Sequence, residues 1–365
     1  MAKPRIRCMS PRPRRDVLAR RLTALGGRRI GTHLPLAIGL PRAAERARLI
    51  GATAVQVFAD NPTAWRRRLE PPTGIDTFRE RLSALDIGPL AIHASYLVNL
   101  CGADEESWRR SVDSLVAELR MGERYGARYL NVHIGSHRGL GRDAGVARLA
   151  TGLRAVGDEV GEPPDVPMLV LENSAGTGDG VGSRLEDLVD ILEAAARAGV
   201  DPDRIGFCLD TAHLWGVGYG IDDPDEVDRL LARVDAELGP GRLKMIHLND
   251  SKAPRGSLRD RHEHIGAGQI GPRGMHAWLT HPRLADVPAF LETPGMDVGY
   301  DRVNMDRVRR LIGGEELPQL PAKAFALHRD RPRMARKGPR ARIDLEPAES
   351  TDEGVPDLPL DRPAE

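Results

Sequence analysis

Histidine and carboxylate side chains end six successive short apolar runs of this sequence. Neighbouring members of the set are separated by 37 to 45 residues. The six residues are His93, His133, Glu172, Asp210, His247 and Glu292. A single acid or histidine after such a run often has a structural role, for example as a helix cap. Three carboxylates gathered in one buried place would repel one another unless cations or protons neutralised them. The whole set therefore predicts metal binding.

The types of these side chains restrict the choice of metal. Imidazole mixed with carboxylate and no thiolate suits zinc, with manganese or iron as alternatives. The three cysteines, Cys8, Cys101 and Cys208, are scattered and form no CxxC motif. This spacing argues against a thiolate zinc site or a disulfide framework and predicts a reducing, cytoplasmic location.

Further candidate ligands follow two of the six positions. His213 lies three residues after Asp210, and Asp260 with His262 lies in the segment after the run that ends at His247. More than four ligands imply more than one ion, and this number could hold three. Glu263 and His264 are adjacent to His262 and could replace it.

The elements that must position these residues alternate regularly along the chain. Eight apolar runs are expected to be strands, at residues 29–32, 54–58, 89–93, 129–133, 168–172, 205–210, 243–247 and 289–292. Amphipathic stretches separate them, including 107–125, 184–198 and 224–238, and another follows at 300–312. Eight βα units in about 280 residues predict an α/β fold, a (β/α)₈ TIM barrel, in which the carboxyl ends of all strands meet at one mouth. A doubly wound open sheet is the alternative, but no GxGxxG motif follows the first run.

The two ends of the chain differ in composition from this central part. We predict a basic flexible extension at 1–28, a barrel domain at 29–315 and a flexible tail at 316–365 that is rich in proline and charge. Lys and Arg together equal Asp and Glu at 53 each, so any basic surface must be local. No apolar run reaches the 18 or more residues of a membrane span, so no membrane partner is expected.

Motifs around the candidate ligands carry a family resemblance. Their sequences are HASYLVNL at His93, LNVHIGS at His133, LENSAGTG at Glu172, LDTAH at Asp210, HLNDSK at His247, DRHEHIGAGQIG at Asp260 and LET at Glu292. Together and in this order they resemble endonuclease IV, a family of trinuclear-zinc endonucleases that cut DNA at abasic sites on a TIM barrel. The resemblance covers residues 29 to 313, and Ile134 is a minor departure, because the family usually has proline there.

The resemblance implies a role for each ligand position. A first zinc would be held by His93, His133 and Glu172. The second zinc would be held by Glu172, Asp210, His247 and Glu292, and the third by His213, Asp260 and His262. The implied activity is that of a zinc-dependent phosphodiesterase, with Mn²⁺ as a possible substitute metal. It hydrolyses the bond 5′ to the lesion, leaves a 3′-hydroxyl and a 5′-deoxyribose phosphate, and trims blocked 3′ ends. Glu292 or Glu172 would orient the attacking water.

The implied partner is double-stranded DNA that contains abasic sites or blocked 3′ ends, bound by a monomer. Tyr96 and Leu97 match the positions at which the family inserts side chains into the duplex. Thr63 stands where an inserting arginine is expected, and this difference weakens the expected insertion into the duplex. Basic residues near the site, Arg66 with its neighbours and Arg138 with Arg142, are candidates for phosphate contacts. We expect Asn173, Ser174, Asn249 and Ser251, which lie next to ligands, to orient them.

Two other functions are compatible with parts of this pattern. A metal-dependent sugar isomerase or epimerase on the same barrel would use carboxylates and histidine around one or two ions, and the extra His213, Asp260 and His262 argue against it. A DNA-damage binding protein that no longer cuts would not need a complete ligand set. Metal content and nicking of an abasic duplex discriminate among the three.

Overall fold

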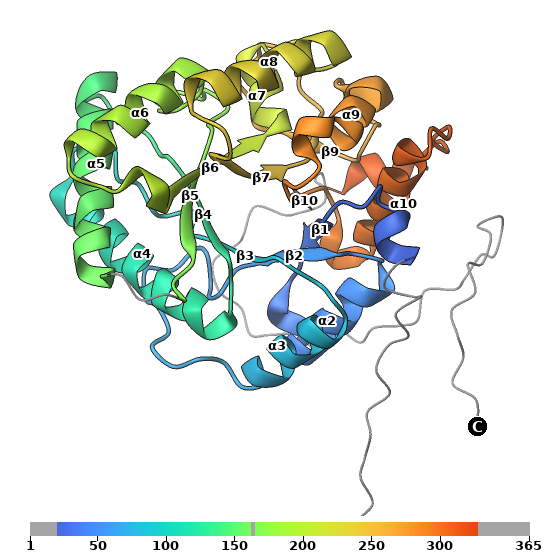
Figure 1. Cartoon of the computed structure of the whole chain (residues 1–365), viewed down its shortest axis with the longest axis horizontal. Helices are drawn as coiled ribbons and strands as arrows, with labels where there is room; N and C mark the ends of the chain where they lie inside the picture. Colours follow the sequence, from blue (N-terminus) through green and yellow to red (C-terminus); the bar gives the residue numbers. More distant parts are fainter. Residues whose placement is uncertain (1–19, 162–164, 328–365) are drawn as a thin grey trace, which may run out of the picture. The chain divides into compact units, whose positions relative to one another are not determined.

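Eight parallel strands close into a barrel in the computed structural model, which describes residues 20–161 and 165–327 (Figure 1). Around the barrel the strands follow the order β1-β10-β7-β6-β5-β4-β3-β2. Each barrel strand therefore pairs with the strands that precede and follow it in the chain. The first strand, β1, pairs with the last, β10, and this pairing closes the ring. The predicted TIM barrel is confirmed, and the open sheet is excluded.

The barrel strands lie within one or two residues of the predicted runs. They are β1 (Ile30–His33), β2 (Ala54–Val57), β3 (Leu90–His93), β4 (Tyr129–His133), β5 (Met168–Glu172), β6 (Ile205–Asp210), β7 (Leu243–His247) and β10 (Ala289–Leu291). A two-stranded antiparallel sheet, β8 (Asp250–Ser251) with β9 (His262–Glu263), lies outside the barrel. Glu292 follows β10 directly rather than ending the strand.

Helices surround the ring of strands (Figure 1). Their bounds are α2 (Leu40–Leu49), α3 (Ile75–Ala84), α4 (Glu105–Tyr125), α5 (Arg142–Val160), α6 (Leu185–Arg197), α7 (Thr211–Val217), α8 (Pro224–Glu237), α9 (Gly271–Thr280) and α10 (Tyr300–Ile312). Short 3₁₀ turns are η1 (Leu36–Ile38), η2 (Pro202–Arg204), η3 (Pro282–Leu284), η4 (Met296–Val298) and η5 (Ala322–Ala326). Local sequence explains the ends of the long helix α4, since Asp104 accepts a hydrogen bond from the Ser107 N–H and Gly126 takes the left-handed conformation after Tyr125.

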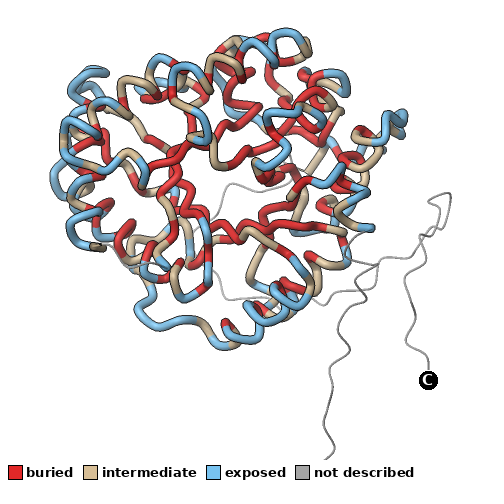
Figure 2. Tube along the Cα trace, viewed as in Figure 1, coloured by how far each residue is buried: buried red, intermediate tan, exposed pale blue. Residues whose placement is uncertain are grey.

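Two layers of apolar side chains hold the barrel together. Seven residues, one from each of seven strands, form the cluster inside the ring: Ala54, Ala91, Tyr129, Val170, Cys208, Met245 and Phe290. A larger cluster packs the outer faces of the strands against the buried faces of the helices, as the burial pattern in Figure 2 shows. Because strands of a barrel are covered on both sides, their residues are nearly all buried.

The register of the strands brings polar side chains to one level at the carboxyl ends. His33 pairs with Gln56, His133 with Glu172, and Asp210 with His247. A shift of one residue in any of these pairs would turn a polar side chain toward the opposite face of its strand. The barrel thus builds its mouth from residues that are far apart in the sequence.

The predicted division at residues 28 and 315 stays a prediction, and most of both extensions, 1–19 and 328–365, lies outside the described residues. Within the described part, no helix is both long and apolar enough to cross a bilayer.

Candidate metal centre

The nine candidate ligands converge at the carboxyl ends of the strands. Eight of them fall into three groups in which potential ligand atoms all lie within 4.8 Å of one another. These groups are His93, His133 and Glu172; Glu172, Asp210, His247 and Glu292; and Asp210, His213 and His262. Glu172 and Asp210 each belong to two groups, so the three groups form one continuous centre.

Glu172 lies at the middle of the centre and is fully buried. Its Oε2 lies 3.7 Å from His93 Nε2 and 3.9 Å from His133 Nε2. Its Oε1 faces His247 Nδ1 at 3.1 Å. The two oxygens therefore point toward different groups of ligands, as a carboxylate that bridges two ions requires.

Asp210 and His213 are held in place by the start of helix α7. Asp210 is the N-cap residue of this helix, and its Oδ1 accepts a hydrogen bond from the His213 N–H at 3.0 Å. This capping interaction places the His213 ring in the first turn, over the mouth of the barrel. The same motif, Asp-Thr-Ala-His, thus supplies both a helix start and two candidate ligands.

The ninth residue, Asp260, lies beside the third group and is more exposed than its neighbours. Its carboxylate is 3.4 Å from His213 Nε2 and 3.0 Å from His262 Nε2. Asp210 also faces His262, at 3.5 Å between Oδ2 and Nε2. The third group therefore contains Asp210 with two of the residues that the resemblance implies, His213 and His262, and Asp260 lies beside it.

The ring nitrogens of four histidines are oriented for metal binding. His93, His213 and His262 each bond through Nδ1 to a backbone carbonyl, at 2.8, 2.7 and 2.9 Å. His247 bonds through Nε2 to Gln56 Oε1 at 3.0 Å. In a neutral ring, the nitrogen that faces an oxygen acceptor carries the proton, which leaves a lone pair on the other nitrogen. Protein metal sites use this arrangement to fix the orientation of histidine ligands.

Charge at the centre is strongly unbalanced toward the acidic side chains. Burial alone would lower the pKa of His247, but Glu172 and Glu292 raise it to about 9. Burial also opposes protonation of His262, whose pKa is nevertheless raised to about 10 by Asp210 and Asp260. Although burial raises the pKa of a carboxyl group, His247 and His33 hold the pKa of Glu292 well below its usual range. A bound cation would satisfy the same negative charge.

Within the described part of the chain, several buried atoms of the centre have charged neighbours but no hydrogen bond. Glu172 Oε1, His247 Nδ1 and His262 Nε2 are buried and make no hydrogen bond. Buried polar atoms are almost always paired, so atoms of this kind indicate a missing ligand. All three are potential metal-ligand atoms, and the residues present therefore fit divalent metal ions.

Two residues from β1 and β2 belong to the centre and were not predicted from the sequence. The buried Gln56 donates through Nε2 to Glu292 Oε1 at 2.7 Å and accepts from His247 through Oε1. His33 Nδ1 lies 3.1 Å from Gln56 Nε2 and 3.6 Å from Glu292. The sequence contained one signal for His33, since this histidine comes directly after the first apolar run, near the position that His93 has at the end of the third.

Only part of the predicted orienting set contacts ligands. Asn173 accepts from the Asp210 N–H at 2.7 Å, and Asn249 donates to Asp210 Oδ2 at 2.7 Å. Asn131, which was not predicted, donates to Glu172 Oε2 at 2.6 Å. Ser174 and Ser251 instead accept from backbone N–H groups of their own loops, at Gly176 and Ala253.

The neighbours of His262 that could have replaced it point elsewhere. Glu263 accepts from the His264 N–H at 3.0 Å and lies 3.6 Å from Lys252. The His264 ring bonds to Ala324 O and Asn304, on the C-terminal side of the barrel. Neither residue belongs to the three groups of ligands.

The predicted DNA-contact residues lie in loops at the mouth. Tyr96 is 58% exposed, and its ring packs edge-on against Phe58 at 5.2 Å and lies 5.6 Å from His93. Leu97 is half-buried, and Arg66 and Arg138 are exposed. Nothing in this geometry tests their contact with DNA, so it stays a prediction.

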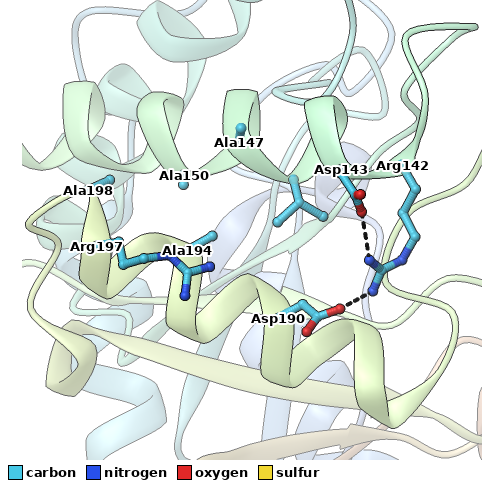
Figure 3. A pocket seen from close by; sticks show the side chains of 9 residues that line it. Arg142, Asp143, Ala147, Ala150, Asp190, Ala194, Arg197 and Ala198 are labelled. Atoms are coloured by element: carbon cyan, nitrogen blue, oxygen red, sulfur yellow. Dashed lines mark hydrogen bonds and ion pairs between the residues drawn. The ribbon is translucent and has the colours of Figure 1, made fainter.

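Two further arginines among the phosphate candidates have intramolecular partners. The side chain of Arg67 is 7% exposed and lies 3.3 Å from Glu118. Arg142 pairs with acidic side chains of α5 and α6, including Asp143 and Asp190, beside a hollow of about 490 Å³ between these helices (Figure 3). The residues that line this hollow include none of the candidate ligands.

Comparison with known proteins places this geometry in a family. The family model of the xylose isomerase-like TIM barrel matches residues 44–312. A probable endonuclease 4 of Halothermothrix orenii is 39% identical over 282 residues, which are 76% of this chain and 99% of that protein. The crystal structure of endonuclease IV from Thermus thermophilus superposes with a TM-score of 0.68 at 34% identity, and covers 78% of this chain and 99% of that one.

Sugar epimerases share the fold at much lower identity. A 3-keto-D-glucoside 4-epimerase from E. coli has a TM-score of 0.54 and 12% identity, covering 78% of this chain and 98% of that one. At this identity the likeness extends to the barrel alone. The identity and coverage of the endonucleases are far higher, and this chain therefore belongs to the endonuclease IV family of xylose isomerase-like TIM barrels, a family of nucleases in DNA repair.

Proposed function

We propose that this protein hydrolyses the phosphodiester bond 5′ to abasic sites in double-stranded DNA, with zinc ions held by the nine candidate ligands. The products would be a 3′-hydroxyl and a 5′-deoxyribose phosphate, and the same site would trim blocked 3′ ends. The observation that carries the proposal is the orientation of four histidine rings, whose free nitrogens converge on carboxylates. Three ions, with zinc preferred over manganese, agree best with three overlapping groups of ligands.

Divalent ions at this centre would supply activated water at neutral pH and neutralise the charge on the phosphoryl oxygens. The two candidate catalytic carboxylates differ in how exposed they are at the mouth. Glu292 is the more accessible of the two candidate catalytic carboxylates, with 17% of its side chain exposed, whereas that of Glu172 is fully buried. Because Gln56 holds Glu292 Oε1, the other oxygen, Oε2, which lies 3.4 Å from His247 Nδ1, is the one that would orient a water molecule at the mouth. Glu172, whose Oε2 accepts from Asn131, would instead serve as a metal ligand common to the first two groups.

The test is nicking of a duplex that contains one abasic analogue, with and without chelator, with metal content measured on the same preparation. We expect about three zinc ions per chain and loss of nicking in chelator. Glu292→Gln should reduce nicking by at least about 100-fold, because amide nitrogen cannot accept the proton of the attacking water, and should leave DNA binding detectable. Glu193→Gln on the exposed face of α6 is the control and should keep full activity.

Three results would contradict the proposal. These are a zinc-loaded protein that leaves the abasic duplex intact, nicking that chelator does not affect, and full activity of Glu292→Gln. A content of one or two ions with no nicking would instead favour a sugar isomerase or epimerase. The predicted monomeric state and cytoplasmic location stay predictions.

A further inference from the structure

The segment that follows the last helix, residues 313–327, packs beside the loop that carries Asp260 and His262. We call residues 313–327 the C-terminal strap. It begins where the family-model match ends, at residue 312. We propose that the C-terminal strap positions the third group of metal ligands through His264, which acts as a positioning residue. This inference rests on one part of the proposed function, namely that the third group binds metal.

His264 connects the ligand loop to α10 through one ring nitrogen and to the strap through the other. Asn304 Oδ1 accepts from the Ile265 N–H at 3.0 Å, which fixes the orientation of its amide group. The Asn304 Nδ2 group therefore donates to His264 Nδ1, at 3.0 Å. The ring proton must then be on Nε2, which donates to Ala324 O of the strap at 3.1 Å. In each of these three hydrogen bonds a donor therefore faces an acceptor.

Packing supports the same connection. His264 and Ala324 are both fully buried, and the His264 ring lies between Tyr300 and Phe325, at centroid distances of 5.0 and 6.1 Å. The buried Arg307 donates to Ile265 O in the ligand loop and to Pro318 O in the strap, the latter at 2.8 Å. The strap and the loop therefore share two anchoring side chains.

The strap also reaches the segment that follows Glu292. A Cβ atom on Gly295 would lie 2.6 Å from Leu327 Cδ1, and a Cβ atom on Gly266 would lie 2.5 Å from Leu317 Cδ1. The two loops that the strap touches are themselves joined at the centre, since His262 Nδ1 donates to Glu292 O. Loss of the strap should therefore loosen His262 and Asp260 first, and leave the groups around Glu172 in place.

The test compares full-length variants on both sides of the contact. His264→Phe removes both ring hydrogen bonds and keeps the aromatic packing, and Ala324→Asp inserts a charge into the buried face of the strap. Each has a matched control: His276→Phe, because His276 also bonds to a backbone carbonyl, at Leu311, and Ala322→Asp, because Ala322 is on the exposed face of the strap. The measurement is zinc retained per chain during titration with a competing chelator.

We expect both test variants to lose about one zinc ion per chain at a chelator concentration that leaves the wild type and the controls loaded. This corresponds to a 10- to 100-fold weaker third site, the effect usually seen when support of a metal ligand is removed. If His264→Phe does not fold, Ala324→Asp decides the question, because the strap lies outside the barrel strands. Zinc retention equal to that of the wild type in a folded test variant would overturn the proposal. Nicking is scored separately, so a wild type that binds three ions without cutting DNA would contradict the proposed function and not the role of the strap.

Discussion

At the scale of single residues, the centre depends on side chains that hold the ligands as much as on the ligands. Gln56 is the most connected of these, because one amide group contacts His247, Glu292 and His33. Its oxygen determines which nitrogen of His247 carries the proton, and its nitrogen orients one oxygen of Glu292. The second group of ligands should therefore depend on a residue that binds no metal.

Replacing Gln56 by methionine keeps the length of the side chain and removes both polar contacts. We expect a 10- to 100-fold loss of zinc affinity with a similar loss of nicking, because His247 and Glu292 lose their fixed orientation. Competition with a zinc-binding dye measures the affinity. Gln319→Met at an exposed position is the control. An unchanged affinity for all ions would show that Gln56 has no positioning role.

Glu118 is a second residue whose surroundings lead to a measurable effect. It is buried beside Arg67 and accepts from the Ser95 N–H at 3.3 Å. Burial outweighs the attraction of Arg67 and raises the pKa of Glu118 to about 7, from 4.5 in an unfolded chain. Folding thus takes up a proton between these two values, and the contribution of this group to stability is full below pH 4.5 and is lost as the pH rises through 7.

Glu118→Gln removes this dependence, because glutamine has no charge at any pH. The wild type should lose stability relative to the variant as the pH rises. Between pH 5 and pH 8 the difference in their free energies of unfolding should change by roughly 2 kcal/mol. Urea denaturation in chelator measures it without a contribution from metal binding. A difference for Glu118→Gln that stays constant between pH 5 and pH 8 would refute the raised pKa.

At the scale of elements, the loop from β8 to α9 determines where Asp260 and His262 lie. The buried carboxylate of Asp250 closes this loop, because it accepts hydrogen bonds from the N–H groups of Gly268, Ile270 and Gly271. Gly268 is close to this carboxylate, since a Cβ atom there would lie 2.5 Å from Asp250 Oδ1 and 2.5 Å from Ser251 O.

Gly268→Ala should consequently destabilise the protein by roughly 1–3 kcal/mol and weaken zinc binding at the third group, because the loop must move to accept the methyl group. Gly157→Ala in α5 is the matched control, since a Cβ atom there would meet nothing within 4 Å. It should be neutral or stabilising by roughly 0.5–1 kcal/mol, as is usual for glycine inside a helix. Thermal unfolding in chelator and zinc titration separate the two effects, and equal behaviour of both variants would rule out the close contact at Gly268.

At the scale of the whole molecule, the distribution of charge determines how the protein would approach DNA. Its formal net charge is zero, yet residues 1–19 contain five arginines and one lysine against the single acid Asp16. The chain just after this segment packs against the rest of the described structure, because Leu25 is fully buried and Arg28 donates to Trp278 O and Leu279 O. A deletion that tests the basic segment should therefore end before residue 20.

Deletion of residues 2–19 should flatten the dependence of DNA affinity on salt concentration, because fewer counterions are released on binding. The slope of log Kd against log salt should decrease by about 0.9 for each phosphate that the shortened protein no longer neutralises. Nicking at low salt should stay close to that of the full chain, since the metal centre is intact. A slope equal to that of the full chain would exclude a role for these residues in DNA binding.

The sequence by itself determined the barrel and most of the centre. Strands of a closed parallel barrel end at one mouth, so the type of the last residue of each apolar run was enough to predict that His93, His133, Glu172, Asp210 and His247 would meet. The helix-capping motif that holds His213 is also local in the sequence. Local patterns of this kind can be predicted because neighbours along the chain produce them.

Only the tertiary structure decided which atoms face one another across the barrel. Gln56 and Asn131 look like ordinary strand residues, and their partners lie on other strands. Asp210 joins the third group, Arg67 pairs with Glu118 instead of standing free for phosphate, and His264 turns toward the C-terminal strap. These contacts depend on strand register and loop closure, which arise from packing of the whole barrel and leave no periodic pattern in the sequence.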